Sequence, residues 1–216
     1  MTPGRSAHEA LAASDPRLAA LMEQVDPAAL ERRMQERDPD RFLALARIIV
    51  GQQVSTAAAR TVWGRVEDAF EGRPTPEALC SPDAEEKLRG AGLSGRKASY
   101  MIGIAEAVVA GELRPDELDE LTDEEVIETL VSLRGLGRWS AEMFLLFDLG
   151  RPDVFSGGDL GLRHGVRIAY GLDEAPSPER AAEIAERWSP NRSLACLYLW
   201  EAIHADLPVA APVGGA

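Results

Sequence analysis

Two glycines placed between two helical patterns constrain the fold of this chain more than any other feature. Residues 133–137 read LRGLG, and one helical pattern ends just before them, near Ser132. A second pattern starts at once, with its apolar side chains on one stripe of period 3.6. That stripe consists of Trp139, Met143, Leu146 and Phe147. Because glycine tolerates positive φ and has no Cβ, Gly135 and Gly137 predict a tight hairpin between two helices.

The predicted hairpin would also offer backbone donors to an anion. The N–H groups of Gly135, Gly137 and Arg138 would have no intrahelical partners, at the positive end of a helix dipole. Arg134 and Arg138 flank them with positive charge. A simple turn between two helices explains the same pattern, so the hairpin alone does not decide the function.

Three further segments accompany the hairpin in a fixed order. Residues 48–55 read IIVGQQVS, residues 153–159 read DVFSGGD, and WSPNRS starts at residue 188 and leads to YLW at 198–200. Together with LRGLGRWSA at 133–141, these segments resemble the helix–hairpin–helix DNA glycosylase superfamily, and most closely its 3-methyladenine DNA glycosylase II branch. The resemblance spans roughly residues 38–204.

The resemblance implies an all-α fold of two helical lobes with a central cleft, and the composition agrees. Strand-like alternation of Val, Ile and Thr is scarce, and only 6% of the residues are aromatic. We expect the fold to cover residues 15–207. One lobe would run from about 40 to 130, and the other would combine the N-terminal helices with residues 131–207. Residues 1–14 are expected to be flexible and 208–216 disordered. No strand pattern precedes residue 38, so we expect no N-terminal β-domain.

Asp159 is the predicted catalytic residue. Cleavage of the bond between a base and its sugar builds positive charge on the sugar, which a nearby carboxylate stabilises. Asp159 follows a flexible Ser-Gly-Gly and precedes a helical pattern, where the helix dipole favours its ionised form. An ordinary N-cap is the alternative. Asp153 is a weaker rival, since it could simply cap a helix or pair with an arginine.

The resemblance also assigns the DNA contacts and the base pocket. The loop with Gln52 and Gln53 would enter the minor groove beside the lesion. The hairpin would grip the DNA backbone through Arg134, Gly135, Leu136, Gly137, Arg138 and Ser140. An alkylated purine is cationic, and an indole face attracts a cation by roughly 0.5–2 kcal/mol. Trp139, Met143 and Trp200 are therefore the predicted pocket residues.

Arg96 and Lys97 form a smaller signal at the start of another helical pattern. Cations in the first turn of a helix oppose its dipole, which is mildly unfavourable. Their position suggests an anionic partner, although solvated surface charge is the simpler explanation.

No enzyme cofactor is expected. Relatives with an iron–sulfur cluster use four cysteines, and this chain has two, Cys80 and Cys196. By resemblance, the backbone carbonyls of Val131, Leu133 and Leu136 would hold a structural monovalent cation, Na⁺ or K⁺. Relatives with lyase activity carry a lysine just after the hairpin, where this chain has Trp139. We therefore expect a hydrolase of the N-glycosyl bond without lyase activity.

The net charge of −13 is unusual for a protein that binds DNA. Acidic residues crowd segment 112–128, with only Arg114 against them, whereas 134–138 and 163–167 are basic. We therefore expect an acidic face and a basic cleft, with an affinity that falls steeply with salt. The first residues contain no apolar h-region, so we expect no signal peptide, and the apolar runs are too short to span a bilayer. Because Cys80 and Cys196 show no pairing signal either, we expect a cytoplasmic protein, associated with the nucleoid in a bacterium. We also expect a monomer.

The leading hypothesis is thus a monofunctional DNA glycosylase that removes alkylated bases of the 3-methyladenine type from duplex DNA during base excision repair. A non-catalytic helix–hairpin–helix module that only binds DNA is the alternative, and it would be indifferent to Asp159. An adaptor that docks helices onto another protein would also fit the acidic surface.

Overall fold

A computed structural model describes residues 5–30 and 38–211, and every regular element in these two ranges is helical. This confirms the predicted all-α fold and the absence of an N-terminal β-domain from the described residues. The chain divides into two compact units. Unit 1 combines Met1–Glu36 with Gly150–Ala216, and unit 2 is Arg37–Leu149. Among the described residues, no helix combines the length and the apolar character that a membrane span requires.

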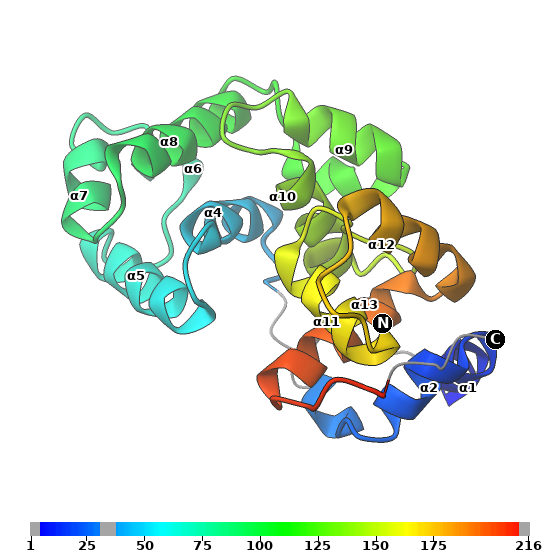
Figure 1. Cartoon of the computed structure of the whole chain (residues 1–216). Helices are drawn as coiled ribbons and strands as arrows, with labels where there is room; N and C mark the ends of the chain where they lie inside the picture. Colours follow the sequence, from blue (N-terminus) through cyan, green and yellow to red (C-terminus); the bar gives the residue numbers. More distant parts are fainter. Residues whose placement is uncertain (1–4, 31–37, 212–216) are drawn as a thin grey trace. The chain divides into compact units, whose positions relative to one another are not determined.

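Unit 2 is built around a nearly fully buried helix, α4. Its buried side chains include Phe42, Leu43, Leu45 and Ile49, and α5, α8, α10 and η2 pack against it (Figure 1). The elements of this unit are α4 (Arg41–Gly51), α5 (Thr56–Ala69), α6 (Pro76–Leu79), α7 (Ala84–Gly90), α8 (Gly95–Val109), the 3₁₀-helix η1 (Pro115–Glu120), α9 (Asp123–Val131), α10 (Arg138–Met143) and the π-helix η2 (Phe144–Leu149).

Polar caps fix where these helices begin. The hydroxyls of Ser55 and Ser94 accept the N–H groups of Ala58 and Lys97 at the starts of α5 and α8. Thr122 and Glu125 form a capping box at the start of α9. After α9, the glycine hairpin leads directly into α10.

Unit 1 contains α1 (Arg5–Ser14), α2 (Pro16–Met22), α11 (Leu160–Tyr170), α12 (Pro178–Ala185), the 3₁₀-helix η3 (Glu186–Trp188) and α13 (Arg192–His204) (Figure 1). Helices α11 and α13 pack closely at Gly165. A Cβ added there would lie only 2.6 Å from the Cβ of Leu199, so no larger residue would fit without a shift. Helix α13 is buried over most of its surface, which explains its apolar sequence on every side.

The buried carboxylate of Asp15 ties the N-terminal helices to the rest of unit 1. It caps α2 by accepting the N–H groups of Arg17 and Leu18. Its other oxygen accepts the indole N–H of Trp188 at 2.9 Å and the hydroxyl of Tyr170. Burial and this neighbouring carboxylate raise the pKa of Tyr170 well above its ordinary value.

Two expectations about the ends of the chain need correction. Residues 5–14 form α1 rather than a flexible segment, since Leu11 is buried and His8 contacts the hydroxyl of Tyr198 at 2.7 Å. Residues 1–4 lie outside the described ranges. Residues 208–211 are irregular but not loose, because the N–H of Ala210 donates to the carbonyl of Ile168 at 2.9 Å. Residues 212–216 of the expected disordered tail are not described.

The boundary between the units also differs from the expected lobes. It falls between Leu149 and Gly150 and not at residue 130, so the whole hairpin belongs to unit 2. The reason is packing: α10 contacts α9 and α4, and η2 continues α10 against α4. The Gly-rich loop and Asp159 belong to unit 1.

Candidate functional site

Asp159 lies at the N-cap of α11 and is partly exposed. Its Oδ1 atom accepts the N–H of Leu162 at 2.7 Å and the indole N–H of Trp200 at 3.2 Å. Its own N–H donates to the carbonyl of Ser156 at 3.0 Å. The carboxylate is therefore held in one orientation at the start of α11.

Small residues make room for this carboxylate. A Cβ at Gly161 would lie 3.0 Å from Oδ1 of Asp159 and 3.2 Å from Nε1 of Trp200. A Cβ at Gly157 would lie 2.7 Å from the carbonyl oxygen of Pro178, so the loop passes directly over the start of α12. The Gly-rich loop is thus a close packing element that places Asp159, and not merely a flexible link.

Trp200 has a role that the sequence did not reveal. It was expected in the base pocket, and in the structure its indole N–H binds the carboxylate predicted to be catalytic. No sequence spacing links residues 159 and 200, because the contact arises from the packing of α11 on α13.

Asp153 forms a structural pair, in agreement with its lower ranking. Its two oxygens accept Nε and Nη2 of Arg192 at 2.8 and 3.0 Å, and the hydroxyl of Ser189 at 2.8 Å. Burial by itself would raise the pKa of Asp153, but the hydrogen bonds from Arg192 and Ser189 outweigh it and lower the pKa. This pair fastens the start of α13 to the loop before α11.

The glycine hairpin has the conformation that the sequence predicted at Gly135. Its φ is +100°, and a Cβ there would lie 2.2 Å from Cγ of Tyr100, so the aromatic ring covers the glycine. Leu136 is buried, and Gly137 is the N-cap of α10 without a side chain that could cap it. The carbonyl of Leu133 accepts the N–H of Leu136 at 3.2 Å, which leaves its second lone pair for a cation.

The two hairpin arginines have partners within unit 2. Nε of Arg138 lies 2.9 Å from Oε1 of Glu142, and its Nη1 lies 3.6 Å from Oε1 of Glu124. The guanidinium of Arg134 lies over the ring of Tyr100 at 5.8 Å. Glu124 belongs to the acidic segment 112–128, so this segment contacts the hairpin. The expected separation of an acidic face from the basic hairpin is therefore wrong at this point.

The glutamine loop and the hairpin meet directly. Nε2 of Gln52 donates to the carbonyl of Gly135 at 2.8 Å and lies 3.2 Å from Oγ of the buried Ser140. A cavity of about 510 Å³ adjoins this contact. It is lined by Gln52, Gln53, Val54, Ser94, Arg96, Lys97, Tyr100 and Gly135. The structure thus brings together four residues predicted to bind DNA, Gln52, Gln53, Gly135 and Ser140.

Tyr100 and Lys97 are the residues of this cavity whose contacts the sequence did not indicate. They lie three apart on α8, on the helix face that follows the Ser94 cap. Their spacing shows that they share a face, but nothing in the sequence shows that this face meets the hairpin.

The predicted pocket residues divide between the units. Met143 is buried and Trp139 partly buried on α10 in unit 2, whereas Trp200 belongs to unit 1 with Asp159.

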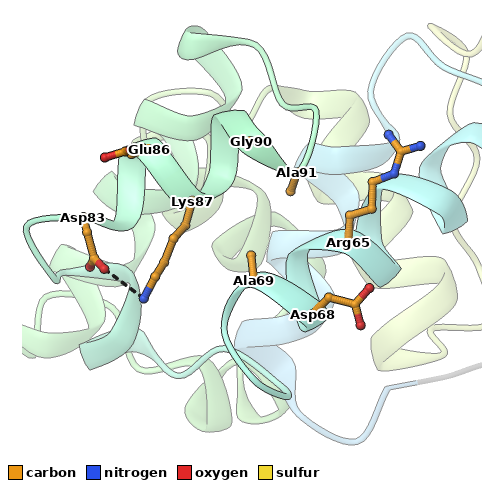
Figure 2. A pocket seen from close by; sticks show the side chains of 8 residues that line it. All are labelled: Arg65, Asp68, Ala69, Asp83, Glu86, Lys87, Gly90 and Ala91. Atoms are coloured by element: carbon orange, nitrogen blue, oxygen red, sulfur yellow. Dashed lines mark ion pairs between the residues drawn. The ribbon is translucent and has the colours of Figure 1, made fainter.

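A second cavity in unit 2, of about 720 Å³, includes no predicted site residue. Figure 2 shows it between α5 and α7, with an ion pair of 2.9 Å between Lys87 and Asp83. Its remaining lining residues are Arg65, Asp68, Ala69, Glu86, Gly90 and Ala91. In the described residues, no group of three or more His, Cys, Asp or Glu side chains is placed to hold a metal ion.

Comparison with known proteins agrees with this geometry. The chain is 34% identical over 173 residues to DNA-3-methyladenine glycosylase 1 of Schizosaccharomyces pombe, and the match covers 79% of this chain and 75% of that protein. A crystal structure of DNA-3-methyladenine glycosidase from Bacillus halodurans superposes with a TM-score of 0.74 at 36% identity, covering 94% of this chain and 92% of that one.

An S. pombe 3-methyladenine DNA glycosylase in complex with abasic DNA gives a TM-score of 0.77 at 30% identity, covering 92% of this chain and 97% of that one. Residues 46–191 match the family described as HhH-GPD superfamily base excision DNA repair protein. This match includes the glutamine loop, the hairpin and Asp159, and the chain therefore belongs to the HhH-GPD superfamily of base excision DNA repair proteins.

Proposed function

We propose that this protein is a monofunctional DNA glycosylase that hydrolyses the N-glycosidic bond of alkylated bases, of the 3-methyladenine type, in duplex DNA. The observation that carries the proposal is the carboxylate of Asp159. It is held at the start of α11 by Leu162 and Trp200, in a chain that belongs to a base excision repair family. The relatives named above, which are 3-methyladenine glycosylases, favour alkylated bases as the substrate.

In this proposal the alkylated base first leaves the helix stack. Gln52 and Gln53 occupy the gap, and the hairpin grips the phosphates through the backbone around Gly135 and Gly137. As the bond from the sugar to the base breaks, positive charge develops on the sugar, and the Asp159 carboxylate stabilises it. The base departs with the bonding electrons, water adds to C1′, and the proton of the water passes to Asp159 or solvent.

Alkylation assists the chemistry and the selection of substrate. An N3- or N7-alkylated purine is cationic, so its glycosidic bond is already weakened and modest catalysis suffices. The proposed pocket residues Trp139 and Trp200 would attract such a base through cation–π contact, worth roughly 0.5–2 kcal/mol. Met143 is the third residue proposed to contact the base.

We further propose that the enzyme has no lyase activity. A lyase needs an amine that attacks C1′, and this chain places Trp139 directly after the hairpin. A monovalent cation held by the backbone carbonyls of Val131, Leu133 and Leu136 would neutralise phosphate charge at the hairpin. We also propose that the enzyme acts as a monomer in the cytoplasm, where its DNA substrate lies.

The decisive experiment presents duplexes that each carry one lesion: 3-methyladenine, 7-methylguanine, 1-methyladenine or hypoxanthine. Base release without strand breakage, followed by breakage only after alkaline treatment, is the expected result. Strand breakage without alkali, or a complex trapped by borohydride, would contradict the proposed lack of lyase activity. Binding of every duplex without base release would instead favour a non-catalytic DNA-binding module.

A further inference from the structure

We propose that Lys97 is a positioning residue that fixes the glutamine loop, residues 50–53, in the shape needed to open the base stack. This inference rests on the proposed glycosylase function. The sequence suggests an anionic partner for Lys97. In the structure its ammonium group instead contacts backbone carbonyls of the protein itself.

The ammonium group of Lys97 binds the end of α4. Its Nζ lies 2.9 Å from the carbonyl oxygen of Val50 and 2.7 Å from that of Gln52. These carbonyls belong to the last turn and the C-cap of α4, where carbonyl groups lack intrahelical partners and the helix dipole is negative. A cation that is unfavourable at the start of its own helix, α8, is therefore favourable at the end of another.

The position of Lys97 distinguishes it from a surface cation that awaits a phosphate. Its side chain is partly buried in the cavity wall, and burial lowers its pKa. Two of its three N–H donors are committed to the carbonyls of Val50 and Gln52. Arg96, its neighbour, is exposed and lines the same cavity.

Gln53, which follows the carbonyl of Gln52 bound by Lys97, has a strained backbone. Gln53 has φ +57°, a left-handed conformation that residues other than glycine rarely adopt. Such strain persists only where the surroundings enforce it, and it is concentrated at functional sites. Here Lys97 holds the carbonyl of Gln52 from one side, while the Gln52 side chain is anchored on Gly135 of the hairpin. The exposed Gln53 and Val54 are thus carried on a loop that is fixed before DNA arrives.

The choice of lysine supports a specific role. The chain contains 23 basic residues, and only Lys87 and Lys97 are lysines. The ammonium group is compact and its donors rotate freely on a flexible stem, so it can reach two carbonyls that arrive from different directions. A planar guanidinium is built for paired oxygens in one plane and fits this task less well.

A fixed loop would act at the base-flipping step. Extrusion of a base costs a few kcal/mol of lost stacking and pairing, and the cost is smaller for a mismatched base. A loop that is already shaped to fill the gap avoids an ordering penalty at that moment. Loss of Lys97 should therefore slow excision most where the base is well paired.

The test compares Lys97→Met with Lys87→Met, the same substitution at the only other lysine. Lys87 pairs with Asp83 at the start of α7 (Figure 2), and it lines the second cavity, which includes no residue of the glutamine loop. Single-turnover base release is measured for 7-methylguanine opposite cytosine and opposite thymine. Amide hydrogen exchange of residues 50–54 is measured on the proteins without DNA.

We expect Lys97→Met to slow release about tenfold opposite cytosine and clearly less opposite thymine. Exchange at 50–54 should quicken in the same variant. Lys97→Arg, which keeps the charge, should restore part of the rate, and Lys87→Met should match the parent in both measurements. Equal slowing in both pairings, an unchanged rate, or unchanged exchange at 50–54 would overturn the inference.

If the parent releases no base from any duplex, the proposed function fails. The exchange measurement then still decides whether Lys97 fixes the loop.

Discussion

At the scale of single residues, the pair of Asp159 and Trp200 is the smallest group that accounts for the proposed chemistry. The indole N–H fixes one oxygen of the carboxylate, and the start of α11 supplies the second donor. A hydrogen bond to a charged group is worth about 1.5–3 kcal/mol. Its loss should therefore appear in the rate of the chemical step.

Trp200→Phe keeps the aromatic ring and removes the donor. We expect single-turnover base release to fall roughly 10- to 100-fold, with little change in duplex affinity. Trp63→Phe is the matched control, because the indole N–H of Trp63 is buried without a hydrogen-bond partner. A Trp200→Phe rate equal to that of the parent would show that the hydrogen bond does not orient Asp159.

Asp153 gives a prediction about pH. Its pKa in the folded protein lies below that in the unfolded chain, which is about 3.9. The Arg192 pair therefore stabilises the fold above about pH 4, and this contribution is lost as the pH falls through the lower, folded pKa.

Asp153→Asn should lower the free energy of unfolding at pH 7 by about 1.5 kcal/mol or more. The variant should also lose part of the acid dependence below about pH 4, as chemical denaturation across pH would measure. Glu183→Gln, which breaks an exposed pair with Arg180, should change little. Identical acid profiles for the parent and Asp153→Asn would rule out this contribution.

The sequence could identify these residues but not all of their partners. A carboxylate before a helical pattern predicts an N-cap, and Asp159 is one. That Lys97 binds the carbonyls of α4, or that Arg138 pairs with Glu124, depends on which helix faces meet. The spacing of residues along the sequence does not show which faces of two separate helices meet.

At the scale of elements, the glycine hairpin is specified by sterics at one position. Gly135 combines φ +100° with the ring of Tyr100 at the place of its missing Cβ. Gly137 has φ −105°, and a Cβ there would meet no atom within 4 Å. The two glycines that look equivalent in the sequence therefore have different structural importance.

Gly135→Ala should lower the free energy of unfolding by about 2 kcal/mol or more, because it adds both strain and a clash. Gly137→Ala, the matched control, should cost about 0.5 kcal/mol or less. Urea denaturation of both variants measures the difference. Similar costs at the two positions would contradict this account of the hairpin.

Helix starts can be inferred from residue type, because Ser and Thr are preferred N-caps and Ser55, Ser94 and Thr122 cap the helices that follow them. Helix α1 is not predicted from the sequence, because a helix of ten residues depends mainly on tertiary packing, here the burial of Leu11. The π-helix over Phe144–Leu149 is not predicted either, because its apolar residues Leu146 and Phe147 also fit a helical period of 3.6.

At the scale of the whole molecule, the net charge of −13 disfavours binding to DNA, which is itself a polyanion. Binding must then depend on a few local contacts, and these are sensitive to salt. For each phosphate that the protein neutralises, a fourfold rise in salt concentration lowers the affinity about threefold. We expect the dissociation constant of an undamaged duplex to rise steeply between 50 and 200 mM salt, as fluorescence anisotropy would measure. An affinity independent of salt would contradict phosphate binding by the hairpin and favour a protein-binding adaptor.

The central claim is that Asp159 stabilises the charge that develops on the sugar. Asp159→Asn keeps the size of the side chain and its capacity to cap α11, but removes the negative charge. The most direct measurement is single-turnover release of an alkylated base from duplex DNA by this variant and by the parent. We predict a rate lower by about 100-fold or more with duplex affinity nearly unchanged. Base release as fast as that of the parent would contradict the assignment.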